Sequence, residues 1–183
     1  FMQQCENIEG NAVGCYNDMD MLIVGMHGNG NVGIGGCTDE QYLQHFAMWA
    51  FLGSPLIIGS DIRNIDEVNK ATLLNKGLIA INQDSANCPA FLIGKDEGKK
   101  YTFGKILSGN RVALAFFNVD AKDDWSQNMS ISFDDLGIHS ESGIGLRLTD
   151  AVTGEDYGIF HDGYSTKLAV DGCRILVGEL VNG

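Results

Sequence analysis

The hydrophobic pattern changes its period about halfway along the 183-residue chain. Up to about residue 91, short apolar runs alternate with helical patterns, whereas strand-like runs follow one another from about residue 92 onward. The first pattern is typical of βα units with parallel strands, and the second of an antiparallel sheet. The sequence therefore predicts two domains, residues 1–91 and residues 92–183, with the boundary near the charged stretch 95–100.

In the first half, the apolar runs 21–24 and 56–59 fit two buried parallel strands. Each run is followed by a loop and a helical pattern. Two such units can neither close a barrel nor cover a parallel sheet on both faces, so this half is predicted to be the end of a larger α/β architecture.

The helices between and after these strands have clear start signals. Thr38 and Gln41 have the spacing of a capping box, and the helix that they begin becomes apolar all round over residues 46–52, which predicts deep burial. Asp66 is the predicted N-cap of a second helix, and Gly77 suits its C-cap.

The second half alternates with period two. Val112, Leu114 and Phe116 share one face of a predicted strand. Asp162-Gly163 and Asp171-Gly172 each stand between strand-like runs, as two-residue hairpins prefer. About seven strands are expected, which predicts an antiparallel β-sandwich.

Composition excludes several classes of protein. A formal net charge of -12 disfavours nucleic acid and membrane surfaces as partners, and the apolar runs are too short to span a bilayer. The chain opens at Phe1 and reads as a piece whose N-terminus lies upstream. Homo-oligomerisation stays open.

The five cysteines contain no C-x-x-C pair, and no two histidines have ligand spacing. No metal site is therefore predicted. An odd number of cysteines leaves a free thiol in the absence of an intermolecular bridge, which favours a reducing, cytoplasmic compartment.

Asp18 and Asp20 are the first candidates for chemistry, because carboxylates at i and i+2 of a strand point the same way. Glycosidases use paired carboxylates, but neighbours on one strand approach a bond from one side only, so a loop-capping role for Asp18 is the commoner alternative. The Gly-rich stretch 25–36 lacks the Lys of a P-loop and is predicted to line a pocket at the end of a strand. Asp61 and Arg63 either bind substrate or pair with each other.

Five ordered segments resemble the motifs of glycoside hydrolase family 27, the bacterial type of α-galactosidase in particular. Residues 17–22 (NDMDML) resemble its N-D-P-D-M-L signature, and residues 36–50 resemble G-L-T-x-E-E-Y…H-F-x-x-W-A. The other three segments resemble A-P-L-x-x-G-x-D-x-R, L-x-N-K and V-I-A-I-N-Q-D; they are residues 54–64, 73–76 and 79–84.

The resemblance implies the last βα units of a (β/α)8 TIM barrel followed by a C-terminal antiparallel β-sandwich. It implies a retaining glycosidase that removes terminal α-linked galactose from galactose-containing saccharides and uses no cofactor. The family's nucleophile and acid/base Asp both precede the signature, so no catalytic residue is expected in this chain, and the N-terminal barrel segment is its expected partner. By the same resemblance, Asp20 and Met21 line the sugar pocket, while Asp18 and Tyr16 support it.

The sequence departs from the family pattern at three places. Tyr16 stands where Trp is usual and Met19 where Pro is usual, and the loop 26–34 is longer than in the plainest members. A longer loop at the catalytic face is expected to narrow access and select the group attached to the sugar. Two alternatives stay open: an α-N-acetylgalactosaminidase or β-L-arabinopyranosidase of the same family, and a non-catalytic sugar-binding or interaction module.

Overall fold

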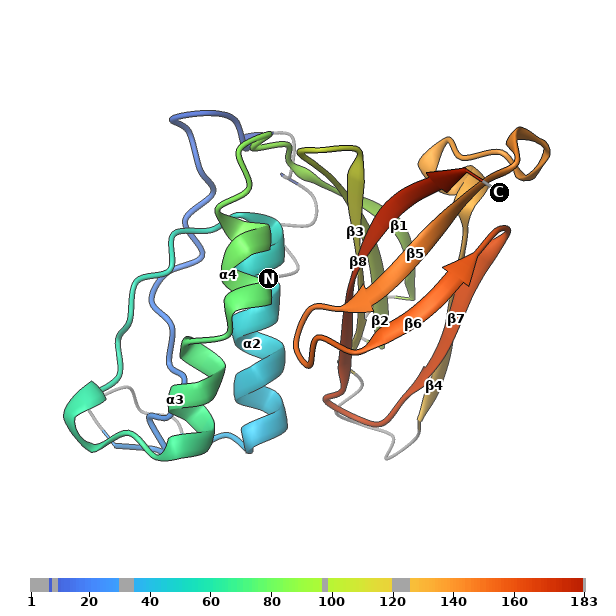
Figure 1. Ribbon diagram of the computed structural model, residues 1–183. Coiled ribbons are helices and arrows are strands. Elements are labelled where there is room, and N and C mark those ends of the chain that lie inside the picture. The colour runs from blue at the N-terminus through green and yellow to red at the C-terminus, as the bar shows by residue number, and fades with distance from the viewer. Residues whose placement is uncertain (1–6, 8–9, 30–34, 97–98, 120–125, 183) are drawn as a thin grey trace.

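The structure is a computed structural model that describes residues 7, 10–29, 35–96, 99–119 and 126–182. Three α-helices of the described part of the chain lie on one side of the molecule: α2 (Asp39–Leu52), α3 (Glu67–Leu73) and α4 (Lys76–Asn82). Two sheets form the other side (Figure 1). No helix within the described ranges is long and apolar enough to cross a membrane.

Eight described strands make up the sheets: β1 (Ala90–Asp96), β2 (Lys100–Leu107), β3 (Arg111–Asn118), β4 (Gln127–Ser132), β5 (Ile144–Asp150), β6 (Asp156–Phe160), β7 (Gly163–Leu168) and β8 (Cys173–Asn182). The larger sheet has the order β1-β2-β3-β8-β5-β6, and β4 pairs with β7 in the smaller one. Every pairing between these strands is antiparallel. The predicted antiparallel sandwich is thereby confirmed.

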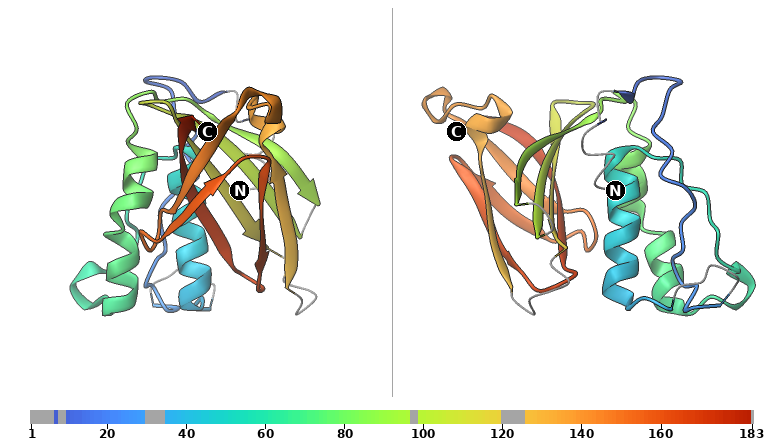
Figure 2. Two further views of the ribbon diagram at one scale, coloured as in Figure 1. Left: turned by 45° about the vertical axis from the view of Figure 1, so that its right-hand side comes forward. Right: turned by 180° about the vertical axis from the view of Figure 1, so that it is seen from behind.

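The molecule has three layers, with the six-stranded sheet between the helices and the two-stranded sheet (Figure 2). Strand β3 contributes side chains to two hydrophobic cores, one on each face of the larger sheet. Val112, Leu114 and Phe116 face the two-stranded sheet, as their spacing predicts, whereas Ala115 and Phe117 face the helices. Seven of the eight positions of β3 are therefore buried.

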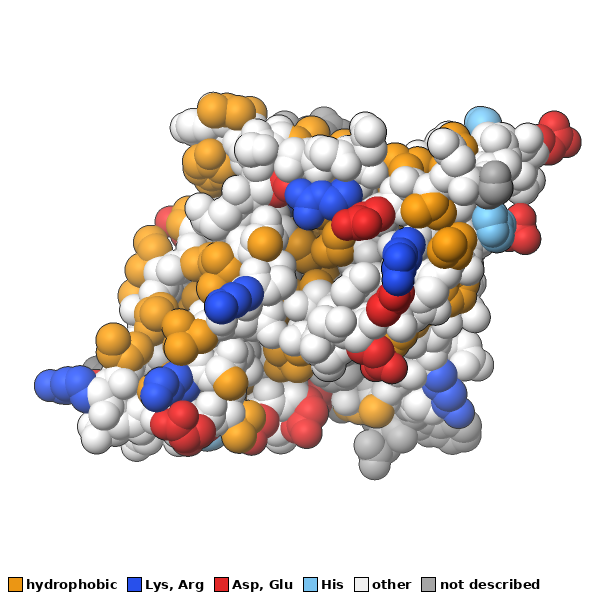
Figure 3. Space-filling view, in the orientation of Figure 1, with side chains coloured by type: hydrophobic (Ala, Val, Ile, Leu, Met, Phe, Trp, Pro, Cys, Tyr) orange, Lys and Arg blue, Asp and Glu red, His pale blue; other side chains and the backbone are white. Residues whose placement is uncertain are grey.

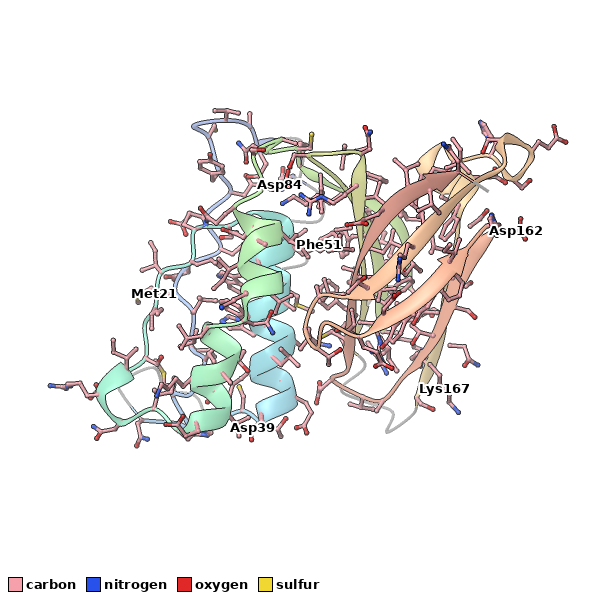
Figure 4. All side chains as sticks on the ribbon, in the orientation of Figure 1. Met21, Asp39, Phe51, Asp84, Asp162 and Lys167 are labelled. Atoms are coloured by element: carbon pink, nitrogen blue, oxygen red, sulfur yellow. The ribbon has the colours of Figure 1, made fainter. Side chains whose placement is uncertain are left out.

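Helix α2 is the main contact between the helical part and the sheet. Thr38 and Gln41 form the predicted capping box, and Gly53 ends the helix in the left-handed conformation with φ 74°. Phe51 points from α2 toward the sheet, where its ring centroid lies 6.5 Å from that of Phe103 (Figure 4). The predicted deep burial of residues 46–52 is confirmed for six of the seven positions, since Trp49 alone among them is only half-buried.

Two local predictions from glycine are wrong. Gly77 does not cap a helix; it lies inside α4, which Asn75 begins by accepting a hydrogen bond from the Leu78 backbone N–H. Residues 162–163 and 171–172 do not close hairpins either, because β7 pairs with β4, whereas β6 and β8 belong to the larger sheet. Both turns instead carry the chain from one sheet to the other.

The parallel strands of the first half are short. Leu22 and Ile58 form a single parallel bridge. Leu22 and Val24 are buried as predicted, but Met21, Ile57 and Ile58 are 52%, 51% and 45% exposed, so the expected burial of the two runs is wrong for these three. No described element covers that side of the run, and apolar side chains gather on this part of the surface (Figure 3).

The charged stretch 95–100 joins β1 to β2, since Asp96 pairs with Lys100. It therefore lies within the sandwich, and β1 begins at Ala90. The division of the chain at residues 91 and 92 remains an expectation about domain organisation.

Candidate functional site

The two extended segments of the helical part run side by side and in the same direction. The backbone N–H of Leu22 donates to the Ile57 carbonyl at 2.7 Å, and that of Gly59 donates to the Leu22 carbonyl at 2.8 Å. Beyond their carboxyl ends lies a hollow of about 550 Å³, lined by Gly25, Met26, Asn29, Gly59, Asp61 and Asn64. In parallel α/β architectures, this end of the strands carries the binding site.

The segment before Leu22 is held in place by hydrogen bonds to side-chain amides and to a side-chain hydroxyl. Asn11 donates to the Leu52 carbonyl at 2.6 Å and accepts from the Asn17 backbone N–H at 2.5 Å. The backbone N–H of Met19 donates to Ser54 Oγ at 3.0 Å. These contacts tie the segment to the end of α2 without any regular strand pairing.

Asp18 and Asp20 lie in a turn, so the expectation that both point the same way from one strand is wrong. Asp20 has φ 73°, a left-handed conformation that Asp adopts more readily than most residues. Asp18 Oδ1 accepts from the Asp20 backbone N–H at 3.1 Å, and Asp20 Oδ1 accepts from the Met21 N–H at 2.7 Å. Asp18 therefore fixes the turn, while the exposed Asp20 carboxylate retains Oδ2 for other contacts.

Trp49 and His45 of α2 form hydrogen bonds with the backbone of this turn and of the segment that follows it. Trp49 Nε1 donates to the Asp20 carbonyl at 2.9 Å, and the ring centroids of Trp49 and His45 lie 3.9 Å apart. His45 Nε2 accepts from the Ile23 backbone N–H at 3.2 Å. Burial lowers the pKa of His45 to about 4, so the ring is neutral and keeps its lone pair for this contact.

Met21 and Tyr16 are both about half exposed, at 52% and 48%. Met21 lies on the side of the molecule remote from the sandwich (Figure 4). Tyr16 lines a separate hollow of about 430 Å³ beside Pro55 and Asn87, where its hydroxyl accepts a 3.3 Å hydrogen bond from Asn87. The structure thus places Met21 next to Asp20, but none of Tyr16, Asp20 and Met21 is among the residues that line the hollow at the strand ends.

Asp61 and Arg63 pair with each other, which was one of the two roles expected for them. Arg63 Nε and Nη2 donate to the two carboxylate oxygens of Asp61, each at 2.8 Å. These hydrogen bonds lower the pKa of Asp61. Because Asp61 also lines the hollow, the pair forms part of its wall.

A polar cluster that the sequence did not predict lies on the Gly-rich stretch. His27 Nε2 is 2.8 Å from Asp66 Oδ2, and the Asn69 amide nitrogen lies 2.8 Å from Asp39 Oδ1. Four residues from three separate segments meet here, so no sequence spacing could reveal the cluster. Residues 30–34 of the long loop lie outside the described part of the chain.

Parallel βα segments with a hollow at their carboxyl ends, followed by an antiparallel sandwich, are the parts of a barrel enzyme with a β domain. Residues 1–84 match the family described as alpha galactosidase A, and residues 97–177 match the alpha galactosidase C-terminal beta sandwich domain. The chain belongs to this family, the α-galactosidases of glycoside hydrolase family 27, and its fold is that of the last barrel units and the sandwich.

Individual relatives agree with this assignment. Alpha-galactosidase 2 of Arabidopsis thaliana is 35% identical over 73% of this chain and 31% of its own length. A probable alpha-galactosidase B of Aspergillus oryzae is 33% identical over 90% of this chain and 38% of its own. The crystal structure of a putative alpha-galactosidase/melibiase from Bacteroides fragilis superposes with a TM-score of 0.81 at 30% identity, covering 96% of this chain and 38% of that one. The chain thus spans about a third of the length of the curated relatives it matches.

Proposed function

We propose that this chain is part of a retaining α-galactosidase that hydrolyses terminal α-linked galactose from oligosaccharides or glycoconjugates. Family membership and the names of the relatives supply the reaction and the substrate class. In this proposal the nucleophile and the acid/base carboxylate belong to parts of the barrel upstream of Phe1.

One observation carries the role of this chain within that enzyme. Asp20 is held in a left-handed turn by Asp18 and Trp49, yet its carboxylate is exposed beside Met21. A fixed, accessible carboxylate is a strong acceptor for sugar hydroxyls, and Met21 offers an apolar surface to the sugar ring. We infer that Asp20 and Met21 form one wall of the galactose pocket.

The geometry of Asp18 supports an indirect role. Its Oδ1 is already engaged by the Asp20 backbone, so it orients the residue that binds the sugar. Two carboxylates on one turn also cannot stand on opposite sides of a glycosidic bond, as a retaining mechanism needs. Asp18 and Asp20 are therefore proposed as a supporting and a binding residue.

The test compares two proteins on an aryl α-galactoside: the full-length product of the gene, and the 183-residue chain alone. Hydrolysis by the full-length protein with the α-anomer as first product is expected, and none by the chain alone. Full activity of the chain alone would disprove the upstream location of the carboxylates. Preference for an α-N-acetylgalactosaminide or a β-L-arabinopyranoside would instead correct the substrate.

Asp20→Asn in the full-length protein tests the binding role. Asn tolerates the left-handed turn and can still accept from the Met21 N–H, so the fold is retained. Loss of a charge-assisted hydrogen bond to the sugar is expected to lower kcat/KM about 10- to 100-fold. An unchanged kcat/KM would remove Asp20 from the pocket.

A further inference from the structure

Three potential metal ligands from separate segments converge beside the Gly-rich stretch. His27 follows the first parallel strand, Asp39 is the first residue of α2, and Asp66 is the N-cap of α3. One ligand atom from each lies within 4.8 Å of the other two. Asp39 lies at the end of α2 that is lowest in the view of Figure 4.

Asn69, which contacts all three of these side chains, is fully buried. Its amide nitrogen has more acceptors within reach than it has hydrogens, whereas its amide oxygen has no donor. Its Nδ2 has four acceptor atoms within reach: Asp39 Oδ1 at 2.8 Å, both Asp66 carboxylate oxygens at 3.0 and 3.1 Å, and His27 Nε2 at 3.3 Å. An amide nitrogen has only two hydrogens to donate. Meanwhile Asn69 Oδ1 is buried without a hydrogen-bond partner among the described residues.

An unpaired buried amide oxygen is costly, and four acceptors around one point are the arrangement that a cation satisfies. A half turn of the Asn69 amide exchanges its two ends and brings Oδ1 to the position facing the carboxylates. That oxygen would then add a fourth ligand facing the cation, and the amide nitrogen would take the buried position in which Oδ1 has no partner.

We propose that His27, Asp39 and Asp66 bind a divalent transition-metal cation of the Zn²⁺ type, with Asn69 Oδ1 as a fourth ligand. The imidazole nitrogen favours Zn²⁺, Ni²⁺ or Cu²⁺ over Mg²⁺ or Ca²⁺, and two carboxylates neutralise the charge of the ion. None of these ligands is a residue assigned to the sugar pocket, so the proposal does not depend on the galactosidase function.

Small movements of exposed side chains complete the site. Ligand atoms about 2.0–2.2 Å from one Zn²⁺ lie roughly 3.4 Å from one another, so the 2.8 Å separation of His27 Nε2 and Asp66 Oδ2 must widen slightly. Both side chains are less than half exposed, at 44% and 42%, and rotation of either is sufficient. Asp66 keeps Oδ1 on the Asn69 backbone N–H at 2.9 Å, so its capping role is compatible with a metal on Oδ2.

The bound cation would connect the loop after the first strand to the starts of both α2 and α3. Because the positive ends of two helices oppose a cation here, we expect affinity in the micromolar range, well below that of closed structural zinc sites. At a free Zn²⁺ concentration of about 100 times Kd, the Tm is expected to rise by about 5–10 °C.

The experiment is calorimetric titration of the 183-residue chain with ZnCl₂. One ion per chain is expected, with at least tenfold weaker binding in His27→Asn and Asp66→Asn, each of which keeps a hydrogen-bonding side chain. The matched control is His139→Asn, which disrupts an exposed His139–Asp134 pair of 3.0 Å elsewhere on the surface, and its affinity should equal that of wild type. Wild-type affinity in both His27→Asn and Asp66→Asn, or no saturable binding, would overturn the proposal.

Two readouts on the wild-type chain identify the side chains that bind the metal. In NMR spectra, Zn²⁺ should shift the imidazole signals of His27 and leave those of His139 in place; the reverse pattern would contradict the assignment, whatever the variants do. With Co²⁺, the absorption spectrum should lack the strong near-ultraviolet band of a metal thiolate. Such a band would mean that one of the free cysteines, such as the exposed Cys15, binds the metal instead.

Discussion

Trp49 Nε1 donates a 2.9 Å hydrogen bond to the carbonyl oxygen of Asp20. The same indole ring contacts the tilted ring of His45, which accepts a hydrogen bond from the Ile23 backbone N–H. One face of α2 thus fixes the proposed sugar-binding turn and the strand that follows it. Any change that moves α2 is expected to move Asp20 with it.

The first prediction concerns this contact. Trp49→Phe keeps an aromatic ring on His45 but removes the donor to Asp20, and it should lower the free energy of unfolding by about 1 kcal/mol. Equilibrium urea denaturation of the 183-residue chain measures the change. Trp49→Ala also removes the ring contact with His45 and the buried ring surface and should cost about 3 kcal/mol. Equal stability of Trp49→Phe and wild type would show that the hydrogen bond does not hold the turn.

The second prediction concerns Gly77 in α4. Alanine is favoured over glycine within a helix by about 1 kcal/mol, so helix propensity alone predicts stabilisation. A Cβ at this position would, however, lie 1.9 Å from the Ala151 carbonyl oxygen of the sandwich. Gly77→Ala should therefore destabilise the chain by about 2–3 kcal/mol, as overpacking does. Denaturation with urea decides the sign of the effect.

Gly94→Ala is the matched control for Gly77, because a Cβ there has open space and the residue has no left-handed φ. Its effect should stay within about 0.5 kcal/mol. If Gly77→Ala is as mild as Gly94→Ala, then α4 and the sandwich are not in close contact in solution.

The third prediction concerns the acid stability of the chain. The Asp84 side chain is only 4% exposed, with Ser108 N–H and Oγ donating to it at 2.8 Å and Arg111 Nη2 at 3.1 Å. Burial acts to raise the pKa of Asp84, but the hydrogen bonds and the charge of Arg111 outweigh it, so the pKa falls below its usual value. Because this pKa is lower in the folded state, Asp84 of the unfolded chain is protonated first as the pH falls, which favours unfolding.

Stability from Asp84 is therefore complete above about pH 4–5 and is lost as the pH falls through the folded-state pKa. Asp84→Asn should cost about 3 kcal/mol at pH 7 and flatten the acid limb of the stability curve, measured by urea denaturation from pH 7 to pH 3. Asp156→Asn, which breaks an exposed pair with Arg147, is the control and should cost less than about 1 kcal/mol. Comparable costs for both variants would contradict the role of burial.

The fourth prediction tests whether the sandwich is an independent module. Residues 90–182 alone would expose the sheet face that packs on α2, including Tyr101, Phe103 and Phe117. A face of this kind promotes association. We expect this segment to bind the dye ANS and to precipitate, whereas the 183-residue chain does neither. A monomeric, ANS-negative segment with cooperative unfolding would favour the binding-module alternative.

The sequence allowed the prediction of features that depend on neighbouring residues. The capping box at Thr38 and the cap at Asp66 are confirmed, because the side chains and the backbone groups that they satisfy are only three residues apart. The face shared by Val112, Leu114 and Phe116 is confirmed for the same reason, since strand geometry alone sets it.

Features that depend on distant residues could not be predicted. Gly77 looks like a helix end locally, but its lack of a side chain is explained by Ala151, which is 74 positions further along the chain. The two Asp-Gly turns have hairpin chemistry, yet the pairing partner of each strand decides which sheet it joins. The cluster of His27, Asp39 and Asp66 likewise arises only when two helix starts meet one loop. The assignment of Asp20, Met21, Asp18 and Tyr16 to a sugar pocket remains a prediction.

Strand β8 lies between β3 and β5 in the larger sheet, although it follows both of them in the chain. During synthesis, the β1-β2-β3 meander and the β5-β6 hairpin would emerge from the ribosome first, each with an apolar face and with the edge that β8 later covers, β3 or β5, still open. Only β8 can join them and close both edges, so the nascent sheet is most prone to pair with another chain just before residue 173 appears. Slowed translation or early termination ahead of β8 would therefore be expected to produce aggregates in place of a shorter folded protein.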